Sequence, residues 1–114
     1  MGERLINLTP HEITLVGSEG EVIASLPPSG TVARCKEVVE TIGHLTINGK
    51  EFPLIVKRLG EVENLPEPQE GTRFIVSLAV AKAAKRDDLL VPGQAVRDEK
   101  GRIIGTAAFA VVRD

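Results

Sequence analysis

Ser77 lies where a strand pattern runs directly into a helix pattern, and it is the residue best placed to bind an anion. Residues 73–76 read as a strand, and residues 78–86 have the spacing of a short helix. The first amide groups of a helix have no intrahelical acceptor and carry a partial positive charge, so a phosphate or carboxylate can bind above them. The alternative is an ordinary N-cap, in which the Ser77 hydroxyl satisfies its own helix and contributes about 1 kcal/mol. The segment lacks the glycines of a P-loop, a dinucleotide-binding turn or a hydrolase nucleophile motif.

The two histidines and the single cysteine are the next candidates for chemistry. His11 follows Pro10 in a predicted turn, where an exposed imidazole can contact an anion. His11, His44 or Cys35 would be the reactive group of a small nucleotide hydrolase, but the sequence places no acid–base partner beside any of them. No pair has the helical spacing of metal ligands, so we predict no metal site and no cofactor. These residues favour a binding protein over an enzyme.

Arg34 and Arg97 each lie in an otherwise apolar strand pattern. A guanidinium in such a strand must face solvent, a carboxylate or a ligand. Pairing with Asp98 or Glu61 and contact with a ligand are both compatible with the sequence.

Short strands joined by Gly, Pro and Asn turns must position these residues. Asn48-Gly49 is the clearest hairpin signal, since both residues accept the positive φ angles of a type I′ turn. Residues 37–43 fit a helix as well as a strand, and their adjacent valines favour a strand. Residues 61–71 are rich in Glu and Pro and are predicted to form a loop.

The expected fold is one β-rich α+β domain covering residues 1–114. It has about seven mostly antiparallel strands, arranged as a sandwich or a partly open barrel, with one helix near residues 78–86.

The composition limits the classes of function. Three Phe, no Trp, no Tyr and a net charge of -2 argue against binding to double-stranded nucleic acid or to stacked bases. One cysteine excludes an internal disulfide, and no window has the length and hydropathy of a signal peptide or membrane span. We therefore expect a cytoplasmic protein with no membrane partner.

Several segments together resemble a family of short proteins encoded by bacteria, phages and prophages. They are residues 7–11 (NLTPH), 28–34 (PSGTVAR), 60–63 (GEVE), 65–68 (LPEP), 70–72 (EGT), 75–77 (IVS), 96–99 (VRDE) and 101–105 (GRIIG). The chain departs from the pattern at Phe74 and Leu78, where the resemblance implies Tyr and a small residue. A phage setting implies, by context only, an accessory protein that inhibits or sequesters something in the host cytoplasm.

The leading hypothesis is a non-enzymatic protein that captures a small anionic ligand, such as a nucleotide-like defence signal. The predicted ligand-binding residues are Asn7, Thr9, His11, Arg34, Ser77 and Arg97. The alternative is an accessory or inhibitor factor that binds a host protein through an exposed strand edge or the acidic loop. A nucleotide hydrolase ranks last. Open sheet edges are also compatible with a homodimer.

Overall fold

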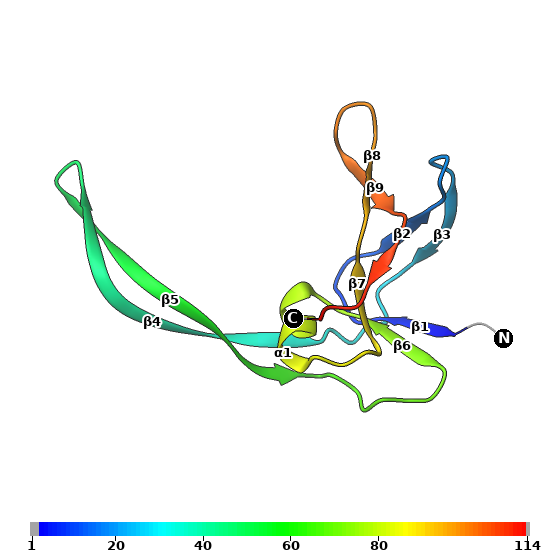
Figure 1. The fold of residues 1–114 in the computed structure, drawn as a ribbon, viewed down its shortest axis with the longest axis horizontal. Helices are drawn as coiled ribbons and strands as arrows, with labels where there is room; N and C mark the ends of the chain where they lie inside the picture. The colour runs from blue at the N-terminus through cyan, green and yellow to red at the C-terminus, as the bar shows by residue number, and fades with distance from the viewer. Residues whose placement is uncertain (1–2, 114) are drawn as a thin grey trace.

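The structure, a computed structural model, describes residues 3–113 as a β-rich body from which a long two-stranded arm projects (Figure 1). The described residues form β1 Arg4–Asn7, β2 Ile13–Val16, β3 Val22–Leu26, β4 Arg34–Ile47, β5 Lys50–Glu63, β6 Thr72–Ile75, α1 Leu78–Ala84, β7 Leu89–Pro92, β8 Ala95–Arg97, β9 Ile103–Thr106 and β10 Phe109–Ala110. The strands make three sheets with the orders β1-β6-β7-β10, β3-β2-β9-β8 and β4-β5. The predicted β-rich fold is confirmed. In place of the expected sandwich or partly open barrel of about seven strands, residues 3–113 form ten strands in three open sheets.

The first sheet carries the hydrophobic core. Its strands β1, β6 and β7 run parallel, and β10 adds an antiparallel edge. The parallel pairing of β6 with β7 depends on α1, because parallel neighbours need a crossover and α1 is that connection. The core cluster consists of Leu8, Ala33, Phe74, Val76, Val80, Ala81, Leu89 and Val91. Across the described residues four of the seven strand pairs are antiparallel, as predicted, and this sheet supplies two of the three parallel pairs.

The second sheet consists of two antiparallel pairs, β2 with β3 and β8 with β9. One parallel contact joins the two pairs, where Leu15 of β2 lies opposite Thr106 of β9. Gly105 makes this contact possible, because a Cβ atom there would lie 2.7 Å from the carbonyl oxygen of Thr14. The buried Thr106 hydroxyl lies 3.0 Å from the carbonyl oxygen of Gln94 and 2.7 Å from that of Ala108, and its single proton can be donated to either. The hydroxyl thereby holds together the two segments that link the first sheet to the second.

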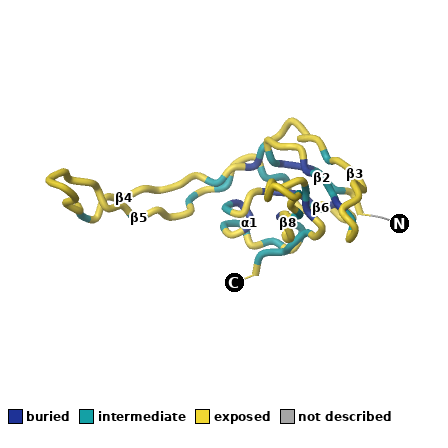
Figure 2. The backbone as a smooth tube through the Cα atoms, turned by 90° about the horizontal axis from the view of Figure 1, so that it is seen from above, coloured by how far each residue is buried: buried dark blue, intermediate teal, exposed yellow. Residues whose placement is uncertain are grey.

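The arm is the antiparallel pair β4 and β5, each 14 residues long. Its turn has Asn48 at φ 51° and Gly49 at φ 79°, which confirms the predicted hairpin. Cys35 and Val62, opposite each other at its base, pack against the core, whereas most residues beyond them are exposed (Figure 2). The arm gives the molecule extents of 59 × 40 × 27 Å and a radius of gyration of 17.8 Å, compared with about 13 Å for a compact domain of this length.

Two predicted boundaries are wrong near the arm and the helix. Residues 61–63 belong to β5 rather than to a loop, because they pair with the beginning of β4. The helix ends at Ala84, two residues early, since Lys85 adopts a left-handed conformation with φ 51°. The uncertain residues 37–43 are strand, as the adjacent valines indicated.

Candidate functional site

Asn7, Thr9 and His11 form one turn at the end of β1. The buried Asn7 amide donates to the carbonyl oxygens of His11 at 2.8 Å and Leu26 at 3.0 Å. Its oxygen accepts from the Thr9 backbone amide at 2.9 Å and from the Thr9 hydroxyl at 2.6 Å. The four hydrogen bonds occupy the Asn7 side chain, so its role in this geometry is to hold the turn and tie it to β3.

Five of the six predicted ligand-binding residues lie around the carboxyl ends of β1 and β6. Asn7 pairs with Ile75, so the turn after β1 and Ser77 after β6 leave the same edge of the sheet. Arg34 begins β4 beside them, because the amide of Ala33 donates to the carbonyl oxygen of Leu8 at 3.0 Å. His11, Arg34 and Ser77 are exposed there.

Ser77 acts as the N-cap of α1. Its hydroxyl accepts from the Val80 amide at 3.3 Å, and its carbonyl oxygen accepts from the Ala81 amide at 3.0 Å. The helix has seven residues, and Ser77 itself has the extended φ of -69° and ψ of 159° typical of a cap. The ordinary capping interpretation accounts for these bonds, and an anion at this position stays a prediction.

Arg97 lies apart from the other predicted site residues. It belongs to β8 in the second sheet, and its guanidinium donates to the carbonyl oxygen of Gly101 at 2.7 Å. The side chain thereby closes the turn between β8 and β9. Neither Asp98 nor Glu61 is its partner in the described interactions, although both were expected candidates for an arginine pair.

The arm has apolar side chains on both faces, which follows from its register. Residues opposite each other share a face, and successive residues alternate. We call the side with more apolar residues the broad face; it carries Val38, Leu45, Ile47, Phe52, Leu54 and Val56. We call the other side the narrow face; it carries Val39, Ile55 and Leu59. Ile42 sits at the irregularity between Thr41 and Gly43, which is a local break in the alternation.

Most of these apolar side chains are exposed to water. Leu45 is 49% exposed and Phe52 is 48% exposed. The exposed set on the arm consists of Val38, Val39, Ile42, Leu45, Ile47, Phe52, Leu54, Ile55 and Leu59. So many exposed apolar side chains on one element are rare on a monomer and typical of a surface that another molecule covers.

Cross-strand ion pairs lie along the arm between the apolar side chains. On the narrow face the Nζ atom of Lys57 is 3.8 Å from Oε2 of Glu37. On the broad face the Nη2 atom of Arg58 is 3.7 Å from Oε2 of Glu40. Both pairs are well exposed, so each contributes little to stability. Their effect is to support the pairing of β4 with β5 while leaving the arm without a strong charge of either sign.

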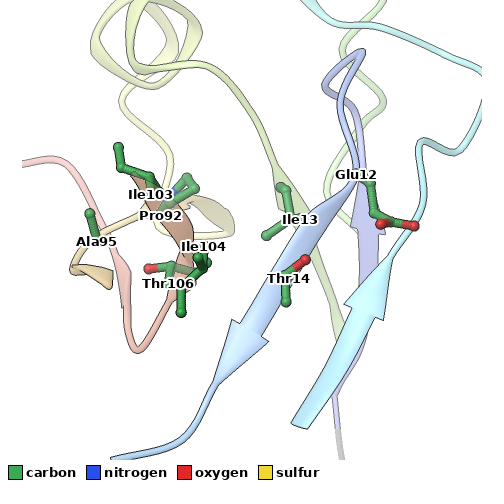
Figure 3. A pocket seen from close by; sticks show the side chains of 9 residues that line it. Glu12, Ile13, Thr14, Pro92, Ala95, Ile103, Ile104 and Thr106 are labelled. Atoms are coloured by element: carbon green, nitrogen blue, oxygen red, sulfur yellow. The ribbon is translucent and has the colours of Figure 1, made fainter. Parts of the chain in front are cut away.

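The body carries an open groove on the side of the second sheet, with a volume of about 390 Å³. It is lined by Glu12, Ile13, Thr14, Pro92, Ala95, Ile103, Ile104, Gly105 and Thr106. Figure 3 shows Ile13 and Thr14 on β2 opposite Ile104 and Thr106 on β9. Two isoleucines of β9 in this lining are exposed, Ile103 to 61% and Ile104 to 43%.

Arg86 and Asp88 form the most buried ion pair among the described residues. The Nε and Nη2 atoms of Arg86 donate to the two Asp88 carboxylate oxygens at 2.9 and 2.6 Å, and Nη1 donates to the Pro66 carbonyl oxygen at 3.0 Å. The hydrogen bonds from Arg86 hold the pKa of Asp88 below its ordinary value, and the same bonds raise the pKa of Arg86. This pair fastens the loop after the arm to the start of β7, so its role is structural.

Known proteins add no assignment to these surfaces. No protein family, curated protein or solved structure matches the chain. The resemblance to short bacterial and phage proteins therefore stays a prediction.

The His, Cys, Asp and Glu side chains of residues 3–113 are too dispersed for a metal site. No group of three or more His, Cys, Asp or Glu side chains lies close enough there to hold a metal ion. Within the same residues, no helix has the length and hydropathy needed to cross a membrane.

The sequence interpretation missed the arm and the groove. The signal for the arm was present, because apolar residues occupy both odd and even positions on either side of Asn48-Gly49. Continuous apolar runs of this kind are typical of strands covered on both faces. The groove had no such signal, since it depends on the contact between β2 and β9, which are distant in sequence.

Proposed function

We propose that this protein is a non-enzymatic protein-binding module and that the β4–β5 arm is its binding element. The observation that carries the proposal is an exposed two-stranded arm with apolar side chains on both faces. A two-stranded hairpin on its own is marginally stable in water. Burial against a partner would remove these side chains from water and stabilise the arm.

The size of the arm suits a specific interface. The free part of the arm is residues 38–47 with their partners on β5, so at about 3.4 Å per residue and about 10 Å across two strands each free face projects about 340 Å². A standard protein–protein interface buries about 800 Å² on each partner. One face alone falls well short of this area, whereas the two faces together approach it.

The arm also has unpaired strand edges. β4 and β5 pair only with each other among the described residues, so both outer edges retain free backbone donors and acceptors. An extended segment of a partner could add to either edge, a common mode of peptide recognition. Apolar contacts on the faces would then provide the specificity.

The test compares two exposed leucines. Leu45 on the arm is 49% exposed and Leu78 at the start of α1 is 51% exposed, so a change to Glu removes a similar apolar surface at each position. Immobilised wild-type protein and each variant are incubated with an extract of the cells that encode the chain. Leu45→Glu is expected to weaken capture of the partner by about 30-fold or more, as for a residue at the centre of an interface.

The Leu78→Glu variant is the matched control and should retain its partners. Quantitative mass spectrometry of the bound proteins, including untagged copies of this chain, provides the measurement. Equal capture by both variants would contradict the proposal that the arm is the binding element.

A second candidate is capture of a small anion at the carboxyl ends of β1 and β6. It is supported by the grouping of His11, Arg34 and Ser77 at this edge, because parallel sheets bind ligands at the carboxyl ends of their strands.

A nucleotide present at a hundred times its Kd should raise the Tm of the protein by about 5 °C or more. Arg34→Ala should abolish the shift, whereas Arg97→Ala should not, since Arg97 lies in the other sheet. A Tm unmoved by every nucleotide of a millimolar panel would exclude this candidate.

A further inference from the structure

We infer that the partner of the arm is a second copy of this chain, and that the broad face of each arm docks on the β2–β9 groove of the other copy. The inference rests on the proposed function and names its partner. Three observations carry it: an exposed apolar arm and a groove with exposed isoleucines lie on one chain, one arm face is too small for a stable interface, and Lys50 on the broad face has the opposite charge to Glu12 in the groove.

The chain carries a projecting apolar element and an open groove lined by both apolar and polar side chains. The broad face presents Leu45 and Phe52 on the outer half of the arm, and the groove presents Ile103 and Ile104. The arm extends away from the second sheet in both views of the molecule, so it does not reach its own groove (Figures 1 and 2). An arm that enters the groove would therefore have to come from another molecule.

A reciprocal exchange of arms doubles the contact that one arm can make. One free arm face offers about 340 Å², which is less than the standard contribution of about 800 Å² per partner. When each copy both donates an arm and receives one, two such contacts form and the buried area is twice that of a single contact. Such an exchange closes with twofold symmetry, the commonest symmetry of soluble oligomers.

The charges at the two ends of the contact are complementary. Lys50 lies opposite Ile47 at the tip, on the broad face, and Glu12 lines the groove. Neither residue makes an ion pair within residues 3–113. An arm docked by its broad face would bring a cation to this carboxylate, and a pair at the rim would help to fix the register of the contact.

The experiment measures molecular mass by light scattering and sedimentation over a range of protein concentrations. The arm variant is Leu45→Glu combined with Phe52→Glu, the groove variant is Ile103→Glu, and Leu78→Glu is the control. Wild type and control are expected to have twice the mass of the chain, and the arm and groove variants the mass of one chain. The four replaced side chains are all exposed, so each variant should fold, as circular dichroism will verify.

Mixing the arm variant with the groove variant gives the sharper result. The groove variant donates a normal arm to the normal groove of the arm variant, so one of the two contacts survives and a mixed dimer is expected.

A charge exchange provides a second readout of the same contact. Lys50→Glu and Glu12→Lys should each raise the dissociation constant of the dimer by about two- to fivefold, and the double variant should recover the loss.

Two results would overturn the inference. A groove variant that remains dimeric while the arm variant is monomeric would mean that arms pack on arms. A wild-type protein that is monomeric up to millimolar concentration would exclude a second copy as the partner. The proposed function is judged separately, because capture from the extract that depends on Leu45 but not on Leu78 would still show that the arm binds another protein.

Discussion

A chain in which residues 40–56 are replaced by Asn-Gly is expected to fold and to lose self-association completely. In the intact protein Val39 lies opposite Lys57, so a two-residue turn can connect these positions without changing the register of the remaining arm. The base of the arm, where Cys35 and Val62 pack against the core, is retained. The core cluster contains no residue from the removed segment, so the free energy of unfolding of the monomer should change by less than about 1 kcal/mol.

Molecular mass and urea denaturation check the two parts of this prediction. The shortened chain should have the mass of one copy at every concentration, and its unfolding should be independent of concentration. A full-length chain with Leu45, Ile47, Phe52 and Leu54 replaced by Thr is the control, because it keeps the length of the arm and loses the apolar surface. A shortened chain that dimerises like the wild type would contradict the account, and so would one that fails to fold.

Replacing Phe74 by Ala is expected to lower the free energy of unfolding by about 3–5 kcal/mol. Phe74 is fully buried in β6 and belongs to the core cluster. Truncating its ring would remove apolar contacts and leave a cavity that the surrounding sheet can only partly fill. This is a large part of the stability of a domain of this size.

Phe52→Ala on the arm is the matched control for Phe74→Ala. Phe52 is 48% exposed, so its truncation should change the unfolding of the monomer by less than about 0.5 kcal/mol. Both variants are measured by urea denaturation at a concentration below the dissociation constant of the dimer, because association adds apparent stability. Similar losses in the free energy of unfolding for the two variants would contradict the assignment of the hydrophobic core to the first sheet.

Local signals in the sequence predicted the parts of the fold that depend on neighbouring residues. Asn48-Gly49 gave the hairpin turn, because few residue pairs accept two successive positive φ angles. Ser77 gave the start of the only helix in the described chain, because a hydroxyl at that position satisfies a free amide. Adjacent valines at positions 38 and 39 favoured a strand for the same local reason.

The parallel pairing of β1, β6 and β7 could not be predicted, because it joins segments that are distant in the sequence. The single contact of Leu15 with Thr106 likewise depends on the room that Gly105 leaves. The grouping of Arg34 with Ser77, and the separation of Arg97 from both, follow from these long-range contacts rather than from any local pattern.

The continuous arm was missed for a different reason. Gly43 and the break in alternation at Ile42 divide its pattern into apparent short strands, although the pairing continues through them. A strand that is apolar on both faces also looks like a buried core strand when only the sequence is available. Its exposure, and hence its interpretation as an interface, could be recognised only from the structure.

Hydrogen exchange of the arm amides as a function of protein concentration tests the central claim most directly. If arms dock on second copies, amides of residues 38–47 and 52–59 should exchange rapidly in dilute protein and become protected as the dimer forms, together with the groove strand β9. The Leu45→Glu variant should stay unprotected at every concentration. Arm amides that exchange at the same rate in dilute and concentrated wild-type protein would contradict the claim.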